Sequence, residues 1–315
     1  MNSYAPIILF TYCRPDHTRR TVEALKHNEL AADSDIFIYS DAAKNHNAEI
    51  GVKQTREYLK TIEGFKSITI IEREKNWGLA NSLIDGISTV INKYGYAIIV
   101  EDDIVTSPYF LRFMNDALIK YRENMSVGVI HGYTMNLGDN MPDTFLTTWI
   151  GCWGWATWKN RWDDFNPDAL FLYNKIISDK SNIYCFDMDL SYQFTKMLRY
   201  QVEGKIDSWA IRWNASNFLK GRMGLQPGHS LVCPIGLDGA AGATHCSSSH
   251  SYDVILSDKP VNILSDLKTE DYVVRKRLSV FYNNVIGKKS KLARIFYLMG
   301  LNKFIVKYSN SFSWI

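Results

Sequence analysis

The first hundred residues alternate between short, mainly apolar runs and longer segments in which apolar residues recur every three or four positions. Such runs are typical of buried strands, and the longer spacing is typical of helices that pack one face on a core. We predict strands at residues 7–10, 36–39, 68–71 and 97–100, with helical patterns at 21–25, 52–62 and 79–91. Strands alternating with helices favour βαβ units, and hence an α/β fold with a mostly parallel sheet flanked by helices.

Polar side chains follow each predicted strand. They are Arg14, Asp41, Arg73 and the triplet Glu101-Asp102-Asp103. Because parallel sheets bind ligands outside the carboxyl ends of their strands, we expect these side chains to meet at one ligand site.

The acidic triplet comes directly after the fourth apolar run. Adjacent carboxylates repel one another and raise each other's pKa, which favours a neutralising cation at the mouth of the sheet. Hard divalent cations such as Mg²⁺ or Mn²⁺ accept carboxylate oxygen and often bridge it to substrate phosphates. The alternative is an exposed acidic turn in which Asp102 or Asp103 caps the backbone near residues 106–108.

The composition is that of a globular protein. Of the 315 residues, 46% are apolar and 22% are charged, which excludes a disordered or fibrous chain. No run approaches the roughly 20 apolar residues of a membrane span, and the first residues lack the pattern of a secretory signal. Five cysteines without a CxxC motif indicate a reducing compartment. We therefore expect a cytoplasmic protein.

The net charge of +3 is unevenly distributed along the chain. Residues 272–315 hold nine Lys or Arg and no acidic residue, so residues 1–271 keep 27 of the 36 basic and all 33 acidic side chains, a net of −6. Basic residues interleaved with apolar ones are typical of a helix on an anionic membrane surface. A helix that packs on its own protein with a solvated basic edge is the alternative. The acidic body argues against nucleic acid as a partner.

Six segments carry a resemblance to a known family. They are 10–15 (FTYCRP), 39–41 (YSD), 76–81 (NWGLAN), 100–104 (VEDDI), 153–158 (WGWATW) and 207–213 (DSWAIRW). In this order they resemble nucleotide-sugar-dependent glycosyltransferases of the GT-A (Rossmann-like) fold, in particular bacterial enzymes that share a core with the N-acetylglucosaminyltransferase I type. The resemblance, over residues 5–246, implies a GT-A domain at 1–250, with a nucleotide-binding half at 1–105 and an acceptor half at 106–250. A basic, amphipathic helical C-terminal extension would follow at 251–315.

The resemblance implies nucleotide-binding roles for residues near the predicted strand ends. Arg14 would contact the nucleotide diphosphate or the base. Asp41 would bond the base, most often uracil in such enzymes, and Asn76 and Asn81 would lie near the nucleoside. Their positions agree with the strand ends found from the apolar pattern.

The resemblance also assigns the acidic triplet to the metal and the donor. Asp103 would bind the metal directly, Asp102 would face the ribose or the metal, and Glu101 would face the donor sugar. His245 lies in a glycine-rich stretch after a further predicted strand at 231–233. In several GT-A enzymes a late His completes the metal site, and imidazole suits Mn²⁺ better than Mg²⁺. An incidental His in a loop is the alternative.

Five of the nine tryptophans fall between residues 149 and 162. Indole faces stack on sugar rings, and the indole N–H bonds hydroxyl groups. Trp153 and Trp155, which lie beside glycines, are candidates for a wall of the sugar pocket, as is Trp209 in the last motif. A buried core cluster is the alternative, and it is favoured for Trp158 and Trp162, which are spaced i and i+4.

Asp207 precedes a predicted helix start. Sugar transfer with inversion needs one carboxylate that deprotonates the acceptor hydroxyl as it attacks the anomeric carbon. Asp207 is the candidate base and Glu203 the second choice, although Asp207 would also suit the N-cap of this helix. In the resembling enzymes the base lies in an Asp-Asp-Trp stretch, whereas this chain has Ser208 at the second position.

Together these features predict a metal-dependent glycosyltransferase that uses Mn²⁺ or Mg²⁺ and a nucleotide-sugar donor, UDP-linked. The acceptor would be a glycan or a lipid-linked oligosaccharide of bacterial surface polysaccharide synthesis, reached at the inner face of the cytoplasmic membrane if the tail binds lipid. A nucleotidyltransferase is a competing class, but it would need a glycine-rich phosphate loop, and residues 11–15 contain no glycine. A non-catalytic carbohydrate-binding protein would use the tryptophans without needing the acidic triplet and Asp207.

Overall fold

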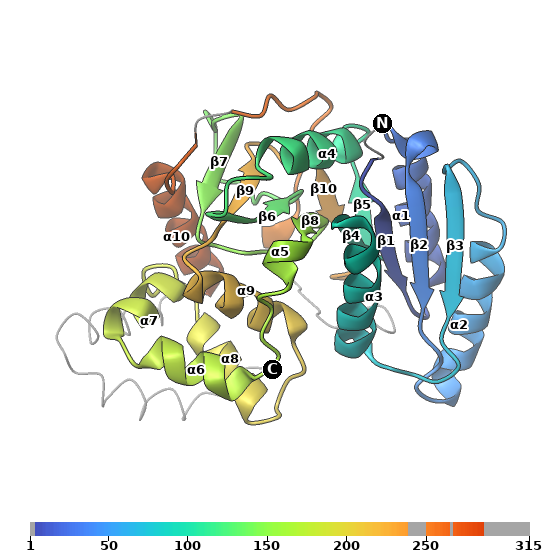
Figure 1. The fold of residues 1–315 in the computed structure, drawn as a ribbon, viewed down its shortest axis with the longest axis horizontal. Coiled ribbons are helices and arrows are strands. Elements are labelled where there is room, and N and C mark those ends of the chain that lie inside the picture. The colour runs from blue at the N-terminus through green and yellow to red at the C-terminus, as the bar shows by residue number, and fades with distance from the viewer. Residues whose placement is uncertain (1–3, 239–249, 265–266, 287–315) are drawn as a thin grey trace.

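The computed structural model describes residues 4–238, 250–264 and 267–286 (Figure 1). Its centre is an eight-stranded sheet with the strand order β3-β2-β1-β4-β8-β6-β9-β7. In that order the strands are Ser67–Glu72, Asp35–Ser40, Ile7–Thr11, Tyr96–Glu101, Trp155–Trp158, Val127–His131, Met223–Pro227 and Thr144–Thr147. A two-stranded antiparallel sheet pairs β5 (Ile104–Thr106) with β10 (Val232–Pro234), so segments far apart in the sequence meet beside β4.

The four predicted strands form the parallel half of the large sheet. Strands β3, β2, β1 and β4 are parallel neighbours and contain the four apolar runs. The other half is mixed, because β8 is antiparallel to both β4 and β6, and β7 is antiparallel to β9, while β6 and β9 are parallel. The predicted α/β fold with a mostly parallel sheet is confirmed, and its parallel pairing is concentrated in the first hundred residues.

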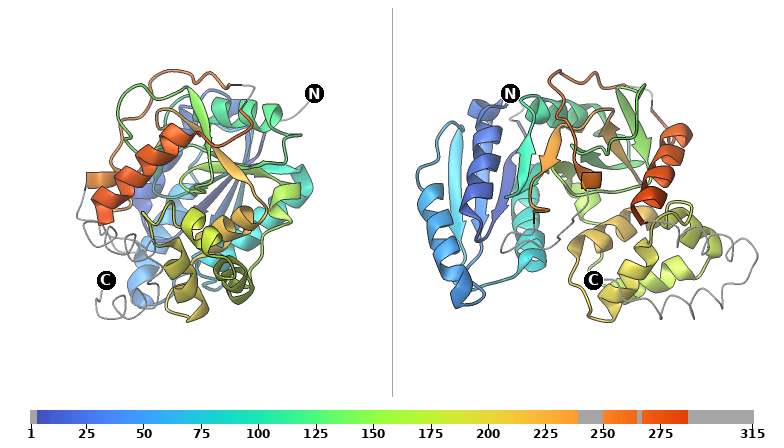
Figure 2. Two further views of the ribbon diagram at one scale, coloured as in Figure 1. Left: turned by 90° about the vertical axis from the view of Figure 1, so that its left-hand side faces the viewer. Right: turned by 180° about the vertical axis from the view of Figure 1, so that it is seen from behind.

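Helices cover both faces of the parallel half (Figures 1 and 2). Alternate residues of β1 point to opposite faces, as the strand period requires. Ile7 and Leu9 join the core with α1 (Pro15–Lys26) and α4 (Phe110–Lys120), whereas Ile8 and Phe10 join the core with α3 (Leu79–Tyr94). The second predicted helix, at 52–62, overlaps α2 (His46–Leu59), which ends three residues earlier than predicted.

A helical group lies beyond the mixed half of the sheet and faces the carboxyl ends of the parallel strands (Figure 1). Its members are α6 (Ala169–Ile177), α7 (Lys180–Phe186), α8 (Phe194–Val202) and α9 (Trp209–Leu219). The short helix α5 (Lys159–Trp162) follows β8, and 3-10 turns lie at Ala31–Asp33 and His250–Tyr252. Trp209 and Trp213 of α9 pack with Trp155 and Trp162, which ties this helical group to the same core as α3.

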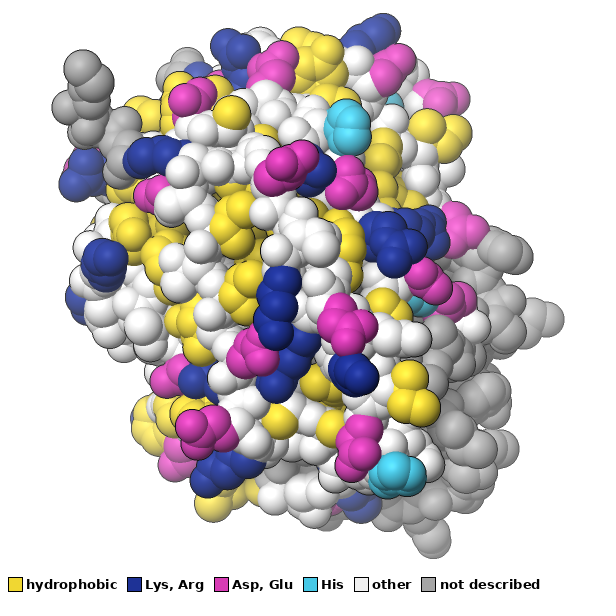
Figure 3. Space-filling view, turned by 90° about the vertical axis from the view of Figure 1, so that its right-hand side faces the viewer, with side chains coloured by type: hydrophobic (Ala, Val, Ile, Leu, Met, Phe, Trp, Pro, Cys, Tyr) yellow, Lys and Arg dark blue, Asp and Glu magenta, His cyan; other side chains and the backbone are white. Residues whose placement is uncertain are grey.

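The face formed by α2 and β3 mixes basic and acidic side chains (Figure 3). Ion pairs on it include Lys53–Glu57, Arg56–Glu72 and Lys60–Glu72. Exposed pairs of this kind contribute roughly 0–1 kcal/mol each. This face therefore lacks the single-sign basic patch that a nucleic-acid-binding surface requires.

The C-terminal helix α10 (Tyr272–Ile286) packs on the domain beside β7. Its Val274, Leu278 and Tyr282 are at most 3% exposed. For residues 272–286 the structure therefore shows a helix packed on its own protein, the second of the two alternatives for the basic tail. The six basic residues after position 287 lie outside the described residues. Among the described helices, none is long and apolar enough to cross a membrane.

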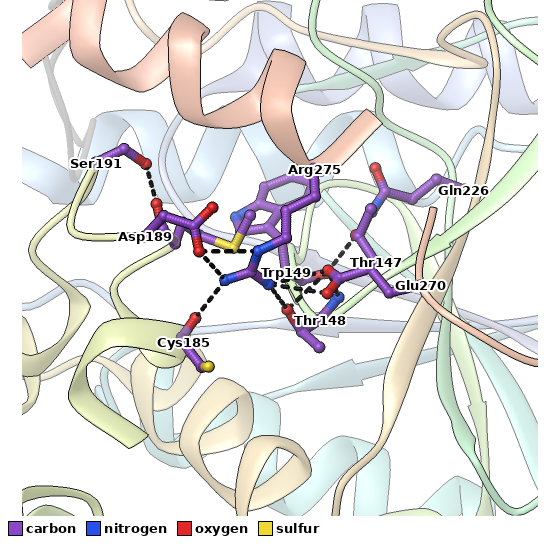
Figure 4. A network of polar contacts seen from close by, with 10 residues as sticks. Thr147, Thr148, Trp149, Cys185, Asp189, Ser191, Gln226, Glu270 and Arg275 are labelled. Atoms are coloured by element: carbon purple, nitrogen blue, oxygen red, sulfur yellow. Dashed lines mark hydrogen bonds and ion pairs between the residues drawn. The ribbon is translucent and has the colours of Figure 1, made fainter. Parts of the chain in front are cut away.

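Arg275 ties α10 to the domain through a buried polar network (Figure 4). Its guanidinium pairs with Asp189 at 2.8 Å and with Glu270 at 2.9 Å, and its side chain is 7% exposed. It also donates to Thr148 Oγ1 at 2.7 Å and to the carbonyl of Cys185 at 3.1 Å. One buried cation thus joins α10 to the end of β7 and to the turn before α8.

Replacing Arg275 by methionine should lower the free energy of unfolding by about 3–5 kcal/mol, because Asp189 and Glu270 would stay largely buried without their cation. Lys276→Met is the matched control, since it removes a positive charge from an exposed position of the same helix. The control should change the free energy of unfolding by less than about 0.5 kcal/mol. Urea unfolding followed by circular dichroism measures both, and equal losses would contradict the anchoring role of Arg275.

The turn before α8 has an unusual backbone that this network supports. Met188, Asp189 and Leu190 are left-handed, with φ of 51°, 57° and 60°. The left-handed conformation costs roughly 1–2 kcal/mol for each residue that has a Cβ, so contacts with the surrounding structure must hold this turn in place. The Arg275–Asp189 pair and the bond from Asp189 N to the carbonyl of Tyr184, 2.9 Å, hold it. This turn therefore fixes the position at which α8 begins.

The same turn contains a carboxyl group whose titration should change stability. Asp187 is 8% exposed and accepts Thr195 N at 2.7 Å. Burial raises the pKa of Asp187 from 3.8 to about 7, although the bonds from Thr195 act in the opposite direction. The pKa of Asp187 is higher in the folded state than in the unfolded state. The contribution of Asp187 to the free energy of unfolding is therefore fully present below about pH 4 and is lost as the pH rises through 7.

Asp187→Asn should therefore stabilise the protein at pH 8 by on the order of 1–4 kcal/mol, because asparagine stays neutral, and the gain should shrink towards pH 4. Urea unfolding at both pH values measures this difference. Asp33→Asn, at an exposed position, serves as the control and should show no such pH dependence. A gain that is the same at pH 4 and pH 8 would show that Asp187 does not titrate as described.

Candidate active site

A cavity of about 710 Å³ lies at the carboxyl ends of β1 and β4 and is bounded on its other side by α8 and the start of α9. Its lining includes the polar residues Thr11, Tyr12, Arg14, Asp41, Lys44, Asn76, Ser82, Glu101, Asp102, Asp103, Tyr200, Asp207 and Ser208. The strand-end side chains predicted to meet thus do so, with the exception of Arg73, and Asp207 joins them from the second half. Five lining residues are acidic and two are basic, so a bound diphosphate would need further positive charge.

The acidic triplet forms the turn between β4 and β5. Thr21 Oγ1 donates to the carbonyl of Asp102 at 2.9 Å, and Ile235 N donates to the carbonyl of Asp103 at 2.8 Å. The turn is therefore held from both sides, by α1 and by the segment after β10. Asp102 is 4% exposed and the Asp103 side chain is 22% exposed, which makes Asp103 the more accessible of the two.

Arg14 reaches this turn from the residue before α1. Pro15 begins that helix, where its fixed φ and missing N–H are both suitable. Arg14 Nη2 donates to Asp102 Oδ1 at 2.5 Å and to Asp103 Oδ2 at 2.8 Å. One guanidinium nitrogen thus bridges two carboxylates, and the Arg14 side chain is only 10% exposed.

The triplet carries more negative charge than Arg14 neutralises. Burial raises the pKa of Glu101 to about 8, and the charges of Asp103 and Asp102 raise it further. Burial also raises the pKa of Asp102 to about 6, against the opposing effect of Arg14. An additional cation would relieve both shifts, and carboxylate oxygens are the ligands that hard divalent cations prefer.

The described residues fit a metal that is only partly held by protein. They contain no group of three or more His, Cys, Asp or Glu side chains arranged to hold a metal ion. Mg²⁺ commonly binds through one or two carboxylates and completes its shell with substrate phosphate and water. Asp102 and Asp103 match that pattern. His245, predicted to complete the metal site, lies outside the described residues.

Asp41 and Asn76 line the cavity and hold the loop that follows β3. Asp41 Oδ1 accepts Trp77 N, and its Oδ2 accepts Gly78 N, both at 2.9 Å. Asn76 Nδ2 donates to Asp41 Oδ2 at 3.1 Å and to the carbonyl of Ala42 at 2.7 Å. Gly78 has φ of 73°, a conformation that favours glycine at this turn into α3. Both side chains therefore shape this wall of the cavity.

Besides Arg73, two predicted site residues do not reach the cavity. Asn81 is exposed outside it, and its Nδ2 donates to the carbonyl of Trp77 at 3.0 Å, which supports the same loop. Trp155 is fully buried, with its ring stacked on Trp209 at a centroid distance of 5.6 Å. The prediction that Trp155 contacts sugar is wrong, because β8 carries this ring into the core between the sheet and α9.

Trp153 and Trp209, the other two tryptophans predicted for the sugar pocket, line the cavity. Trp153 lies edge to face against Tyr133, with a centroid distance of 4.7 Å, so its orientation is fixed. Trp209 is 3% exposed and presents only a small part of its ring. Trp158 and Trp162 are 3% and 5% exposed, which confirms the core position predicted for them.

Asp207 lies on the far wall of the cavity, in the segment that leads into α9. Its side chain is 68% exposed, and Oδ1 accepts Arg212 Nη2 at 3.2 Å. The N-cap of α9 is Ser208, whose hydroxyl accepts Ile211 N at 3.3 Å, so the capping role considered for Asp207 is wrong. Glu203, the second candidate base, ends α8 outside the cavity and pairs with Lys205 at 2.7 Å.

The structure also brings residues to the cavity that the sequence pattern did not single out. They are Tyr12, Lys44, Cys152, Met197, Tyr200 and Gly236. Tyr12 and Lys44 follow the first two strands, so the strand-end rule could have found them. Met197 and Tyr200 lie on α8 and Gly236 follows β10, and only the folding of the second half against the first places them here.

Comparisons with known proteins give one family match and distant likenesses to solved structures. A sequence model of glycosyl transferase family 2 matches residues 7–190, which is more than half of the chain. The comparison with curated proteins finds no match. Among solved structures, S. aureus TarS is 13% identical with a TM-score of 0.31, over 44% of this chain and 23% of that chain. The mannosyltransferase PcManGT from Pyrobaculum calidifontis, in complex with GDP-Man and Mn²⁺, is 10% identical with a TM-score of 0.38, over 69% of this chain and 71% of that chain.

The family match spans the parallel half of the sheet, the acidic turn and the tryptophan-rich segment around β8. These are the parts that build the near wall of the cavity. With its mixed α/β sheet and helices on both faces, the chain is a GT-A glycosyltransferase that belongs to glycosyl transferase family 2.

Proposed function

We propose that the protein transfers a sugar from a nucleotide-diphosphate sugar, UDP-linked, to a hydroxyl group of a glycan or lipid-linked oligosaccharide, with a divalent metal and with inversion at the anomeric carbon. One observation carries the proposal. The acidic turn with Arg14, and the carboxylate of Asp207, come from different halves of the chain and line the same cavity. The arrangement offers a site for a diphosphate leaving group and, on another wall, a carboxylate for the acceptor hydroxyl.

Arg14, Lys44 and the aspartates of the acidic turn form the proposed diphosphate site. Guanidinium groups bind phosphate through pairs of N–H donors. Arg14 Nη1 is buried and has no hydrogen-bond partner in the described part of the chain, so it can donate to a phosphate oxygen. Asp103, together with Asp102, would hold Mn²⁺ or Mg²⁺, which supplies positive charge to the departing diphosphate.

Asp207 is the proposed general base. Arg212 holds one carboxylate oxygen, which leaves the other oxygen for the acceptor hydroxyl. As the hydroxyl oxygen attacks the anomeric carbon, its proton passes to Asp207 and the bond from that carbon to the diphosphate oxygen breaks. A single attack by the acceptor from the side away from the diphosphate inverts the configuration.

The remaining assignments concern the sugar and the acceptor. Trp153 presents an oriented aromatic surface to the cavity, and sugar rings pack on such surfaces. Glu101 and Trp209 line the same space and are proposed to face the donor sugar. The basic residues after position 287 remain the candidate contact with an anionic membrane at the cytoplasmic face, where a lipid-linked acceptor would be found.

A donor screen tests the proposed function. The full chain is incubated with UDP-, GDP- and dTDP-sugars, each with Mn²⁺, with Mg²⁺ or with EDTA, and release of the nucleoside diphosphate is measured. We expect release from UDP-sugars that depends on the metal. Release that is equal in EDTA would contradict the metal, and release from GDP-sugars alone would contradict the UDP assignment. Anomeric analysis of a transferred product tests inversion.

A further inference from the structure

The contacts of Arg14 place a protein cation where a metal would also have to bind. A single nitrogen, Nη2, bridges Asp102 Oδ1 and Asp103 Oδ2. A metal bound by Asp103 would use the carboxylate that already accepts this hydrogen bond from Arg14. A guanidinium and a divalent cation repel one another strongly at such short range, because the side chains lie in a partly buried, low-dielectric setting.

The surroundings leave little room for both cations at once. The segment after β10 passes directly over the ion pair, and Ile235 N bonds the Asp103 carbonyl. A Cβ at Gly236 would overlap the Asp103 carboxylate and would come within 2.8 Å of Arg14 Nη1. The glycine backbone therefore closes one side of the pair, so a metal on Asp103 requires the guanidinium to move.

Arg14 also has a second, unused set of donors. Its Nη1 is buried without a hydrogen-bond partner among the described residues, although the side chain is nine-tenths buried. Leaving such a buried donor unpaired is unfavourable, and an incoming phosphate oxygen would accept its hydrogen bond. The other basic residue in the cavity lining is the exposed Lys44, so Arg14 is the buried cation that a diphosphate would meet.

We propose that Arg14 competes with the divalent cation for Asp102 and Asp103 in the nucleotide-free enzyme and transfers to the diphosphate when the donor binds. The inference rests on the proposed function, since it assumes the metal and the nucleotide-sugar donor. The proposal couples metal binding to nucleotide binding, because the nucleotide removes Arg14 from Asp102 and Asp103. The free enzyme therefore binds the metal weakly, and the nucleotide complex binds it tightly. Coupling of this kind is reciprocal between the two ligands.

Direct contact between metal and phosphate would also couple the two ligands, so the decisive measurement is made without nucleotide. Mn²⁺ is titrated into the full chain, and free Mn²⁺ is followed by electron paramagnetic resonance. Arg14→Gln should bind Mn²⁺ about tenfold more tightly than the wild type, within the usual range of such couplings. Arg14→Lys keeps the charge and should bind Mn²⁺ as weakly as the wild type. Arg112→Gln, which removes an exposed arginine that pairs with Glu29, is the control and should not change the affinity.

Circular dichroism checks that each variant folds, and Arg14→Met provides a second neutral variant with a side chain of similar length. Unchanged or weaker Mn²⁺ binding by the folded neutral variants would overturn the competition while leaving the proposed metal-dependent function intact. A wild type that binds no Mn²⁺ even with saturating UDP would overturn both. In the wild type, saturating UDP should tighten Mn²⁺ binding by at least about tenfold, and it should do so less in Arg14→Gln.

Discussion

Asp207→Asn should slow sugar transfer by about 100- to 10,000-fold while leaving metal-dependent UDP binding unchanged. A positioned general base contributes a rate factor of this size, and asparagine cannot accept the proton of the acceptor hydroxyl. Donor binding should survive because Asp207 lies on the α9 side of the cavity, whereas Arg14 and the acidic turn belong to the ends of β1 and β4. The fold should also survive, because Ser208 rather than Asp207 caps α9.

Glu203→Gln is the matched control for this experiment. Glu203 is four residues away, carries the same charge and lies outside the cavity, where it pairs with Lys205 and Arg199. It should transfer sugar at the wild-type rate. Product formation and UDP affinity are measured for both variants in the presence of Mn²⁺. Full transfer by Asp207→Asn would remove Asp207 as the base, and loss of transfer in the Glu203 variant alone would reassign that role.

Asp103→Ala should abolish the metal-dependent part of UDP binding. In the wild type, UDP affinity with Mn²⁺ should exceed the affinity in EDTA, whereas in the variant the two affinities should be equal. The physical reason is that Asp103 is more exposed than Asp102, at 22% against 6% of the side chain, and so is open to a cation shared with phosphate. Isothermal titration of UDP, with and without Mn²⁺, measures the difference.

The control for Asp103 is a carboxylate at the end of another parallel strand. Glu72 ends β3, pairs with Arg56 and Lys60, and does not line the cavity. Glu72→Gln should retain the full Mn²⁺ dependence of UDP binding. Unchanged Mn²⁺ dependence in Asp103→Ala itself would show that the metal is held elsewhere, and the assignment of the acidic turn would then fall.

The sequence pattern predicted the wall of the cavity formed by the strand ends, because the residues of that wall directly follow apolar runs in the chain. Four apolar runs specify four parallel strands, of which β1, β2 and β4 are largely buried and β3 lies at the open side of the sheet. The residues after each run must emerge where the strands end. Arg14, Asp41 and the acidic triplet were therefore found without any knowledge of the tertiary structure. The mixed half escaped this reasoning, because β6 to β9 are buried although Gly, Thr, His and Gln interrupt their apolar residues, so the sequence shows no continuous apolar run there.

Tryptophan burial shows where sequence reasoning stopped. Trp153 and Trp155 are two residues apart in one motif, yet one lines the cavity and the other is enclosed by Trp162, Trp209 and Trp213. The motif is the same for both, and only the packing of α9 against β8 separates their roles. Arg275 is a second example of a role that the sequence did not reveal. In the sequence it is one of the charges of the basic tail, but in the structure it is buried between Asp189 and Glu270.

The sequence by itself determined the α/β class, the parallel strands and the set of charged residues at their ends, because strand burial and strand-end position depend on residues close together in the chain. The motif around Asp207 nominated it as a base, but only the tertiary structure brings Asp207 and Gly236 to the same cavity as Arg14, more than 190 residues away. It also decided that one nitrogen of Arg14 bridges Asp102 and Asp103. Such long-range meetings depend on how the two halves of the sheet pack, and that packing is set by the whole core rather than by any local pattern.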